Sequence, residues 1–135
     1  MSLDLTSLEK AIGKLTQEME EARLTPTSEL ARDEVIQRFE YTYELSRKTL
    51  RRYLEQSEAN ADEAHDLSFQ GLIRLGWTRG LLSGGWDRWI EYRKARGTTT
   101  HTYDHEKAAA VFAKIPEFLE EASFLLKQLK AHADL

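Results

Sequence analysis

The sequence contains no cysteine and only two prolines in 135 residues. The absence of cysteine excludes disulfide bonds, cysteine nucleophiles and cysteine-ligated zinc. Most of the seven glycines fall within residues 71–85, so long stretches on either side carry few helix-breaking residues. No strand-like alternation and no internal repeat is visible. These features predict an all-α protein.

Long apolar runs and an excess of positive charge are also missing. No apolar stretch approaches the length of a membrane span, and the first residues lack a basic region before an apolar core. We therefore expect a cytoplasmic protein with no membrane segment. The formal net charge of −4 argues against broad electrostatic binding to nucleic acid. The local basic cluster at 47–52 is predicted to be a solvated helix face, balanced by nearby glutamates.

Helical periodicity is present along nearly the whole chain, which at this length we predict to be one domain over residues 1–135. Apolar residues recur at steps of three and four, and the connections are short, as in an antiparallel bundle of about five helices. The expected helices are a first up to Pro26, a second from Thr27 or Ser28 to about Glu55, a third from Ala64 to Gly76, a short fourth from Trp86 to Arg96, and a last from about Asp104 to Ala131.

Turns, loops and a proline are predicted to interrupt these helices. A polar turn is predicted around Asn60 and Asp62, and a loop over residues 76–85. Pro116 removes a backbone donor within the last helical region, so we expect a kink there or a break between two helices. The side chains predicted to face inward in that region are Ala109, Phe112, Ile115, Leu119, Ala122, Leu126 and Leu129.

Three tryptophans, Trp77, Trp86 and Trp89, lie close together before and within the fourth helix. One interpretation is a surface for a partner or for base stacking, because aromatic residues anchor interfaces and stack on bases. The other is that they fill the core beneath the glycine-rich loop. The sequence leaves both interpretations open.

Residues 96–104, with the sequence RGTTTHTYD, lie between the last two helical regions. On a continuous helix Arg96 and His101 would point about 140° apart. Gly97 and the threonines disfavour such continuation, so a helix, a short turn and a new helix near Asp104 are expected, which can bring the polar groups to one surface. In the simpler alternative Gly97 is a helix C-cap, the threonines and Asp104 cap the next helix, and His101 is an exposed loop residue.

The pattern R-x4-H-x-Y between two helices resembles the signature of the HEPN superfamily, small helical proteins that often act as RNases. Residues 96–104 are similar to the version in the HEPN partners of minimal nucleotidyltransferases, known as nucleotidyltransferase substrate-binding proteins and as toxins of HEPN/MNT toxin–antitoxin pairs. Residues 37–50, 71–73 and 113–119, with Trp86, also resemble that family, so the resemblance covers roughly residues 5–130. At Gly97 the family usually has a polar residue, often Asn.

This resemblance implies a metal-independent endoribonuclease with RNA as its substrate. Arg96 would stabilise charge on the phosphoryl oxygens, and His101 would act in proton transfer. It also implies a homodimer with the motifs near a two-fold axis, and a cognate minimal nucleotidyltransferase that attaches AMP to Tyr103 and so blocks the RNase site. At or just before the start of the last helix, Tyr103 is expected to be exposed.

Glu40, Glu44 and Asp104 are candidate supporting residues for this site. Glu40 and Glu44 lie four positions apart on the second helix and could reach Arg96, although such a pair can also form ordinary surface salt bridges. We expect no metal and no cofactor, because the histidine–acid pairs at 65–66 and 105–106 lack a third ligand at helical spacing.

A second interpretation belongs to a different class of protein: a non-catalytic substrate-binding subunit of a two-component nucleotidyltransferase. Gly97 and the acidic net charge favour this interpretation. The complete set of Arg96, His101 and Tyr103 favours the RNase.

Overall fold

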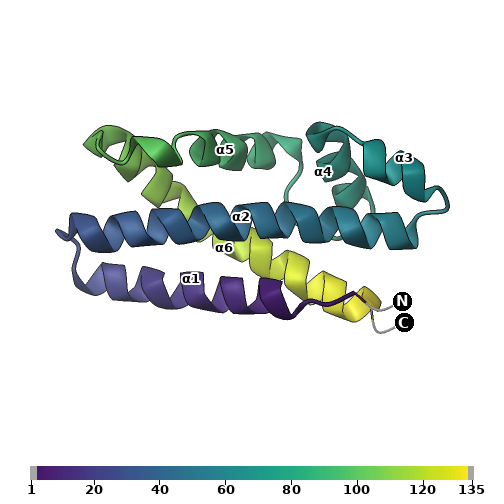
Figure 1. The fold of residues 1–135 in the computed structure, drawn as a ribbon, viewed down its shortest axis with the longest axis horizontal. Helices are drawn as coiled ribbons and strands as arrows, with labels where there is room; N and C mark the ends of the chain where they lie inside the picture. Colours follow the sequence, from purple (N-terminus) through teal and green to yellow (C-terminus); the bar gives the residue numbers. More distant parts are fainter. Residues whose placement is uncertain (1–2, 134–135) are drawn as a thin grey trace.

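The computed structural model describes residues 3–133, so residues 1–2 and 134–135 of the predicted domain lie outside the description. The described chain contains six α-helices, one short 3-10 helix and no strand, which confirms the predicted antiparallel all-α bundle. The elements in order are α1 (Thr6–Leu24), α2 (Glu29–Ser57), α3 (Ala61–Asp66), α4 (Phe69–Thr78), α5 (Trp86–Gly97), η1 (Thr99–His101) and α6 (His105–Ala133), as Figure 1 shows.

Helices α1 and α2 form an antiparallel hairpin (Figure 1). The turn between them contains Pro26, and the hydroxyl oxygen of Ser28 accepts a hydrogen bond from the backbone N–H of Ala31 at 3.1 Å. This capping of α2 was one of the predicted alternatives. The apolar side of α1 is buried as expected, through Leu8, Ala11, Ile12, Leu15, Met19 and Ala22.

The buried stripe of α2 contains hydroxyl groups as well as apolar side chains. Thr42, Ser46 and Thr49 each donate to the backbone carbonyl four residues earlier, at 2.8, 2.8 and 2.7 Å. A buried polar group costs little when it is hydrogen-bonded, so these residues can lie in the core without a partner from another helix. The long helix therefore remains buried along one side from Val35 to Leu54.

Helix α6 runs diagonally behind α2 and ends near the start of α1, where Lys130 pairs with Glu9 at 2.9 Å (Figure 1). It passes Pro116 without interruption, so the alternative of two separate helices is excluded. The inward side is shifted from the predicted one: Ala109 is exposed, while Phe112, Leu119 and Leu126 are only partly buried. The fully buried residues are Ala108, Val111, Ile115, Phe118, Ala122, Leu125 and Leu129. Packing against two long helices selects which part of the broad apolar stripe faces inward.

The predicted third helix was wrong in its bounds. Residues 61–66 form α3 where a polar turn was expected, because Asn60 accepts a hydrogen bond from the N–H of Glu63 and caps it. Gly76 does not end α4, which continues to Thr78. A Cβ at Gly76 would lie 3.1 Å from Leu82 and 3.2 Å from Leu50, so glycine serves close packing there.

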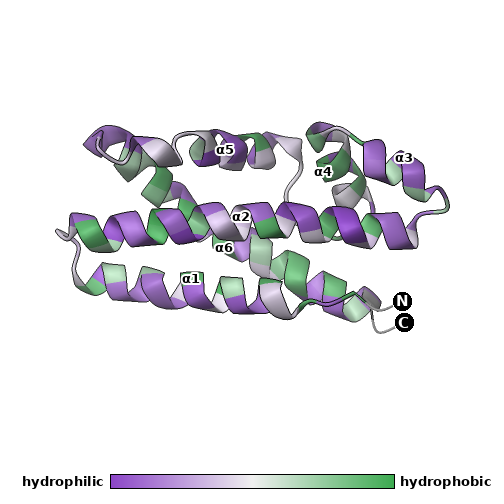
Figure 2. Ribbon diagram, in the orientation of Figure 1, coloured by the Kyte–Doolittle hydropathy of each residue, from purple (hydrophilic) through white to green (hydrophobic). Residues whose placement is uncertain are grey.

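The hydropathy of α3 and α4 differs in the way that their burial predicts. Figure 2 colours much of α3 hydrophilic, in keeping with Ala64 as its one buried residue, whereas α4 shows more hydrophobic positions. Among residues 3–133, no helix is both long enough and apolar enough to cross a membrane.

Candidate functional site

The RGTTTHTYD segment is built as a helix end, a 3-10 turn and a helix start. Helix α5 includes Gly97, and its C-cap is Thr98, so the interpretation of Gly97 as the helix C-cap is wrong. Among the described residues only Gly80 has a positive φ, so nothing in the backbone requires glycine at 97. The carboxylate of Asp104 accepts from the N–H groups of Glu106 and Lys107 at 3.0 and 3.2 Å, which caps α6 as the simpler interpretation expected.

The Arg96 guanidinium lies between two carboxylates of α2. Its Nε is 3.3 Å from Glu44 Oε1, and its Nη2 is 3.4 Å from Glu40 Oε1. The Thr99 hydroxyl donates to the other oxygen of Glu40 at 2.9 Å. The Arg96 side chain remains 34% exposed, so its orientation is restrained while part of the group faces solvent. The structure thus brings both predicted carboxylates to Arg96.

The Glu44 carboxyl has a perturbed pKa. Its partial burial alone would raise the pKa, but the hydrogen bond from Arg47 and the positive charges of Arg47 and Arg96 outweigh that effect. The pKa of Glu44 is therefore held below its ordinary value, and the carboxylate is charged at neutral pH.

His101 and Tyr103 form a second pair. The imidazole Nδ1 lies 3.0 Å from the Tyr103 hydroxyl, and which atom donates depends on the histidine tautomer. Tyr103 is 78% exposed, which confirms the expected exposure. Within residues 3–133 no hydrogen bond joins His101 to Arg96. One chain therefore presents an Arg–carboxylate group and a His–Tyr pair on the same short junction.

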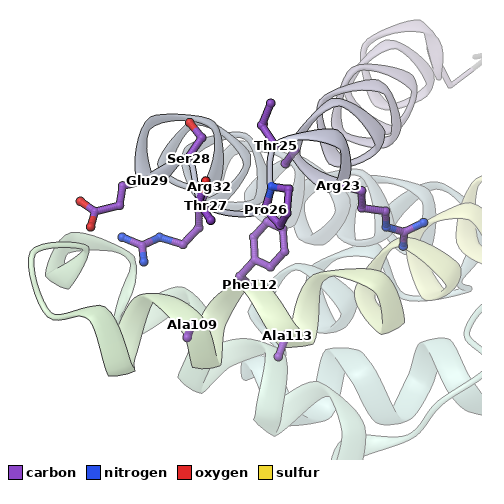
Figure 3. A pocket seen from close by; sticks show the side chains of 11 residues that line it. Arg23, Thr25, Pro26, Thr27, Ser28, Glu29, Arg32, Ala109, Phe112 and Ala113 are labelled. Carbon is purple, nitrogen blue, oxygen red and sulfur yellow. The ribbon is translucent and has the colours of Figure 1, made fainter.

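A further arginine supports the junction from α2. Arg32 Nη2 lies 3.5 Å from the carbonyl oxygen of Thr102 and its Nε pairs with Asp33, while Glu29 lies 3.5 Å from His105. Figure 3 shows Arg32 extending toward the junction, beside a pocket of about 450 Å³ between the α1–α2 turn and α6. The wall of this pocket includes Phe112, which points toward Pro26.

Sequence reasoning missed Thr99 and Arg32. From the sequence, Thr99 is expected only to disfavour helix continuation or to help cap the next helix, although a hydroxyl so near Arg96 was a signal that it could bind the same carboxylate. Arg32 carried no signal, because 70 positions separate it from Thr102. Asp104 makes capping contacts, and its role as a supporting residue of the site stays a prediction.

The remaining candidate groups have structural partners. In the basic cluster, Arg47 pairs with Glu44 at 2.9 Å, and Arg51 donates to three backbone carbonyls before α4. The tryptophans divide between the two interpretations: Trp89 is fully buried, Trp86 is partly buried, and Trp77 is 56% exposed. No group of three potential metal ligands occurs among the described residues.

Comparison with known proteins places the chain among related sequences and structures. The model of a family described as "nucleotidyltransferase substrate binding protein like" matches residues 3–131. Over 95 residues the chain is 46% identical to a Haemophilus influenzae protein named "Probable ribonuclease HepT". That match covers 70% of this chain but 64% of the relative, so it spans less than two thirds of the relative's length.

Two solved structures have the same fold. One, from Haemophilus influenzae, is described as revealing the fold of a substrate binding domain of a nucleotidyltransferase. It has a TM-score of 0.87 and 36% identity, covering 94% of this chain and 99% of that chain. The other, from Thermus thermophilus, has a TM-score of 0.70 and 33% identity, covering 90% of this chain and 98% of that chain.

Proposed function

Because this chain belongs to the nucleotidyltransferase substrate binding protein-like family, and so to the HEPN proteins it resembles, we propose that it is a HEPN-type toxin. Its activity would be that of a metal-independent endoribonuclease, neutralised by a cognate minimal nucleotidyltransferase that attaches AMP to Tyr103. The observation that carries the proposal is the junction itself, where a restrained guanidinium and an exposed His–Tyr pair occur within eight residues.

RNA cleavage at such a site needs one base, one acid and one cation. His101 takes the proton of a ribose 2′-hydroxyl, whose oxygen attacks the adjacent phosphorus. The bond from phosphorus to the 5′-oxygen breaks, and that oxygen receives a proton from an acid, leaving a 2′,3′-cyclic phosphate and a 5′-hydroxyl. The Arg96 fork stabilises the charge that develops on the phosphoryl oxygens.

A homodimer supplies both proton-transfer groups. Two copies related by a two-fold axis would place two His101 side chains at one site, one as base and one as acid. The separation of Arg96 and His101 into different contacts within one chain fits a site completed by a second copy. Light scattering at micromolar concentration should give the mass of a dimer, and a monomer would contradict this arrangement.

AMP attachment explains how a partner could stop the reaction. The Tyr103 oxygen attacks the α-phosphorus of ATP, a new O–P bond forms, pyrophosphate leaves, and the phenolic proton passes to a base or to water. The product carries a bulky anion on the atom that lies 3.0 Å from His101 Nδ1. Both its size and its charge would oppose the approach of an RNA phosphate.

The direct test of the RNase is RNA integrity. Purified wild-type protein should cleave RNA, and its expression without the partner should arrest growth. His101→Ala should abolish both effects while leaving helicity and melting nearly unchanged, because His101 adds little to the core. His65→Ala is the matched control, since that side chain is 69% exposed on α3, away from the junction. Cleavage by His101→Ala at the wild-type rate would remove this residue from the mechanism.

The test of neutralisation uses intact-mass analysis. With ATP, magnesium and the partner, the wild type should gain AMP, whereas Tyr103→Phe should gain none and should remain toxic in the presence of the partner. AMP on another residue, or neutralisation of Tyr103→Phe, would contradict the assignment.

A second candidate function is a non-catalytic subunit that presents substrate to a nucleotidyltransferase. Two carboxylates next to Arg96 and the net charge of −4 favour it, since both oppose the approach of RNA. This subunit would leave RNA intact when pure, and would instead raise nucleotidyl transfer to a third molecule by the partner.

A further inference from the structure

A pocket of about 320 Å³ opens beside the motif arginine, between α2, α4 and α5. Its wall differs from the surface around it because three guanidinium groups meet two aromatic rings and a single carboxylate. The lining residues are Arg47, Arg93, Arg96, Tyr43, Phe69 and Glu44. Arg96 thus belongs both to the junction and to this pocket.

Positive charge exceeds negative charge in this pocket, although the whole chain carries a net charge of −4. Glu44 binds Arg47 through one oxygen at 2.9 Å and Arg96 through the other at 3.3 Å, so it is shared by two cations. Arg93 pairs with no carboxylate among the described residues, and its guanidinium carbon lies 5.7 Å from the centre of the Phe69 ring. One cation of the pocket is therefore available to an external anion.

Tyr43 adds a neutral hydrogen-bond donor to the same wall. Only 3% of this residue is exposed, and burial raises the pKa of its phenol to about 12, so it keeps its proton at neutral pH. Its hydroxyl has no hydrogen-bond partner within residues 3–133. Because Tyr43 lines the pocket, an oxygen bound there can accept a hydrogen bond from this hydroxyl.

We propose that this pocket binds a backbone phosphate of single-stranded RNA, with Arg93 as its principal ligand and Arg47 and Tyr43 as further donors. The inference rests on the proposed RNase function and identifies where the strand continues beyond the cleaved bond. A strand is favoured over a small anion because Arg96 links the pocket directly to the junction, so one polyanion can occupy both. Gly97 also lines the pocket, and a Cβ there would have no neighbour within 4 Å, so no side chain fills that part of the wall.

The test measures binding separately from cleavage. In the His101→Ala background, the dissociation constant of a fluorescein-labelled oligouridylate is measured by anisotropy over a range of salt concentrations. Arg93→Gln should weaken binding several-fold at low salt and lower the slope of log K against log salt by about 0.7, the value for one lost contact with a single strand. Arg52→Gln is the matched control, because it removes the same charge from an exposed site on α2 outside the pocket.

Each result supports or overturns the inference. A loss with Arg93→Gln that Arg52→Gln does not share supports it, and a smaller loss with Tyr43→Phe supports the role of the phenol. Equal losses in the two arginine variants, or no RNA binding at all, overturn it. Inorganic phosphate serves as a second probe. If Arg93→Gln loses phosphate binding but binds RNA as the wild type does, the pocket binds a small anion and the proposal of an RNA strand is rejected.

Failure of the proposed RNase is distinguishable from failure of this pocket. If the wild type does not cleave RNA, yet Arg93→Gln alone weakens RNA binding, the RNase proposal fails and the binding site stands. If the wild type cleaves and Arg93→Gln changes neither KM nor the salt slope, the binding site fails and the RNase stands. Circular dichroism of each variant confirms that the fold is retained.

Discussion

Carboxylates hold the two ends of α5, but in opposite environments. At the start of α5 the carboxylate is that of Glu121, which lies on α6 and is 2% exposed. It accepts four hydrogen bonds, from the N–H and hydroxyl of Ser83, the N–H of Gly84 and the indole of Trp89. At the end of α5 the carboxylates are those of Glu40 and Glu44, which lie on α2 and are about one-third exposed. They pair with the cation of Arg96.

The difference in burial indicates that Glu121 supports the fold, whereas the carboxylates at Arg96 leave that arginine able to change partners. Neither water nor another charged group competes for the hydrogen bonds of a buried carboxylate that is surrounded by neutral donors. Glu121 therefore ties the 83–84 loop and α5 rigidly to α6. Partly exposed ion pairs contribute little stability and exchange partners easily. In the proposed RNase, Arg96 would therefore turn from its carboxylates to an incoming phosphate, while the buried end keeps α5 in place.

The largest expected effect is a loss of stability when Glu121 is removed from the buried end of α5. Glu121→Ala should lower the free energy of unfolding by about 3 kcal/mol, because the buried N–H groups of Gly84 and Trp89 lose their acceptor. Urea unfolding followed by circular dichroism measures this loss. Glu120→Ala is the control, since the neighbouring side chain is exposed and its removal should cost less than about 0.5 kcal/mol. Equal losses in the two variants would show that Glu121 does not support α5.

A change at the exposed end should affect activity rather than stability. Arg96→Lys should reduce kcat for RNA cleavage by about 100-fold, because a point charge cannot replace the planar fork that contacts two oxygens at once. Its melting temperature should stay close to that of the wild type. A variant that retained full activity would show that the geometry of the guanidinium is unimportant.

A pH titration sharpens the comparison further. Because the pKa of Glu44 is lowered in the folded state, its contribution to stability is present above its ordinary pKa of 4.5 and is lost as the pH falls through the lower folded value. The stability difference between wild type and Glu44→Gln should therefore shrink between about pH 6 and about pH 3. Urea midpoints at each pH measure it, and a difference that grew toward low pH would contradict the ion pairs.

The smallest effect is expected at Gly97. With no positive φ and open space at the Cβ position, Gly97→Asn should change the free energy of unfolding by less than about 0.5 kcal/mol. Gly97 is part of the wall of the arginine-lined pocket, so a modest change in KM for RNA, with kcat unchanged, is expected. A large loss of stability would show that glycine is required by the backbone after all.

Much of this protein could be predicted from local sequence. Helical periodicity, Pro26 followed by Ser28, and the Gly97–Asp104 segment each depend on neighbours within one or two turns, so the helices and the position of the junction were predictable. The same reasoning failed at Gly76 and Ala109. There, packing against other helices decided whether a glycine ended a helix and which residues of an apolar stripe faced inward.

By itself, then, the sequence determined the all-helical class, the R-x4-H-x-Y motif and the exposure of Tyr103. The sequence offered Glu40 and Glu44 as candidate partners of Arg96, but only the tertiary structure decided that they contact it, because Glu44 is 52 positions away in the chain. It likewise placed Glu121 against Ser83 across 38 positions, and assembled the arginine-lined pocket from α2, α4 and α5. Local propensity extends over a few residues, whereas ion pairs and pockets require segments that only the packed core brings together.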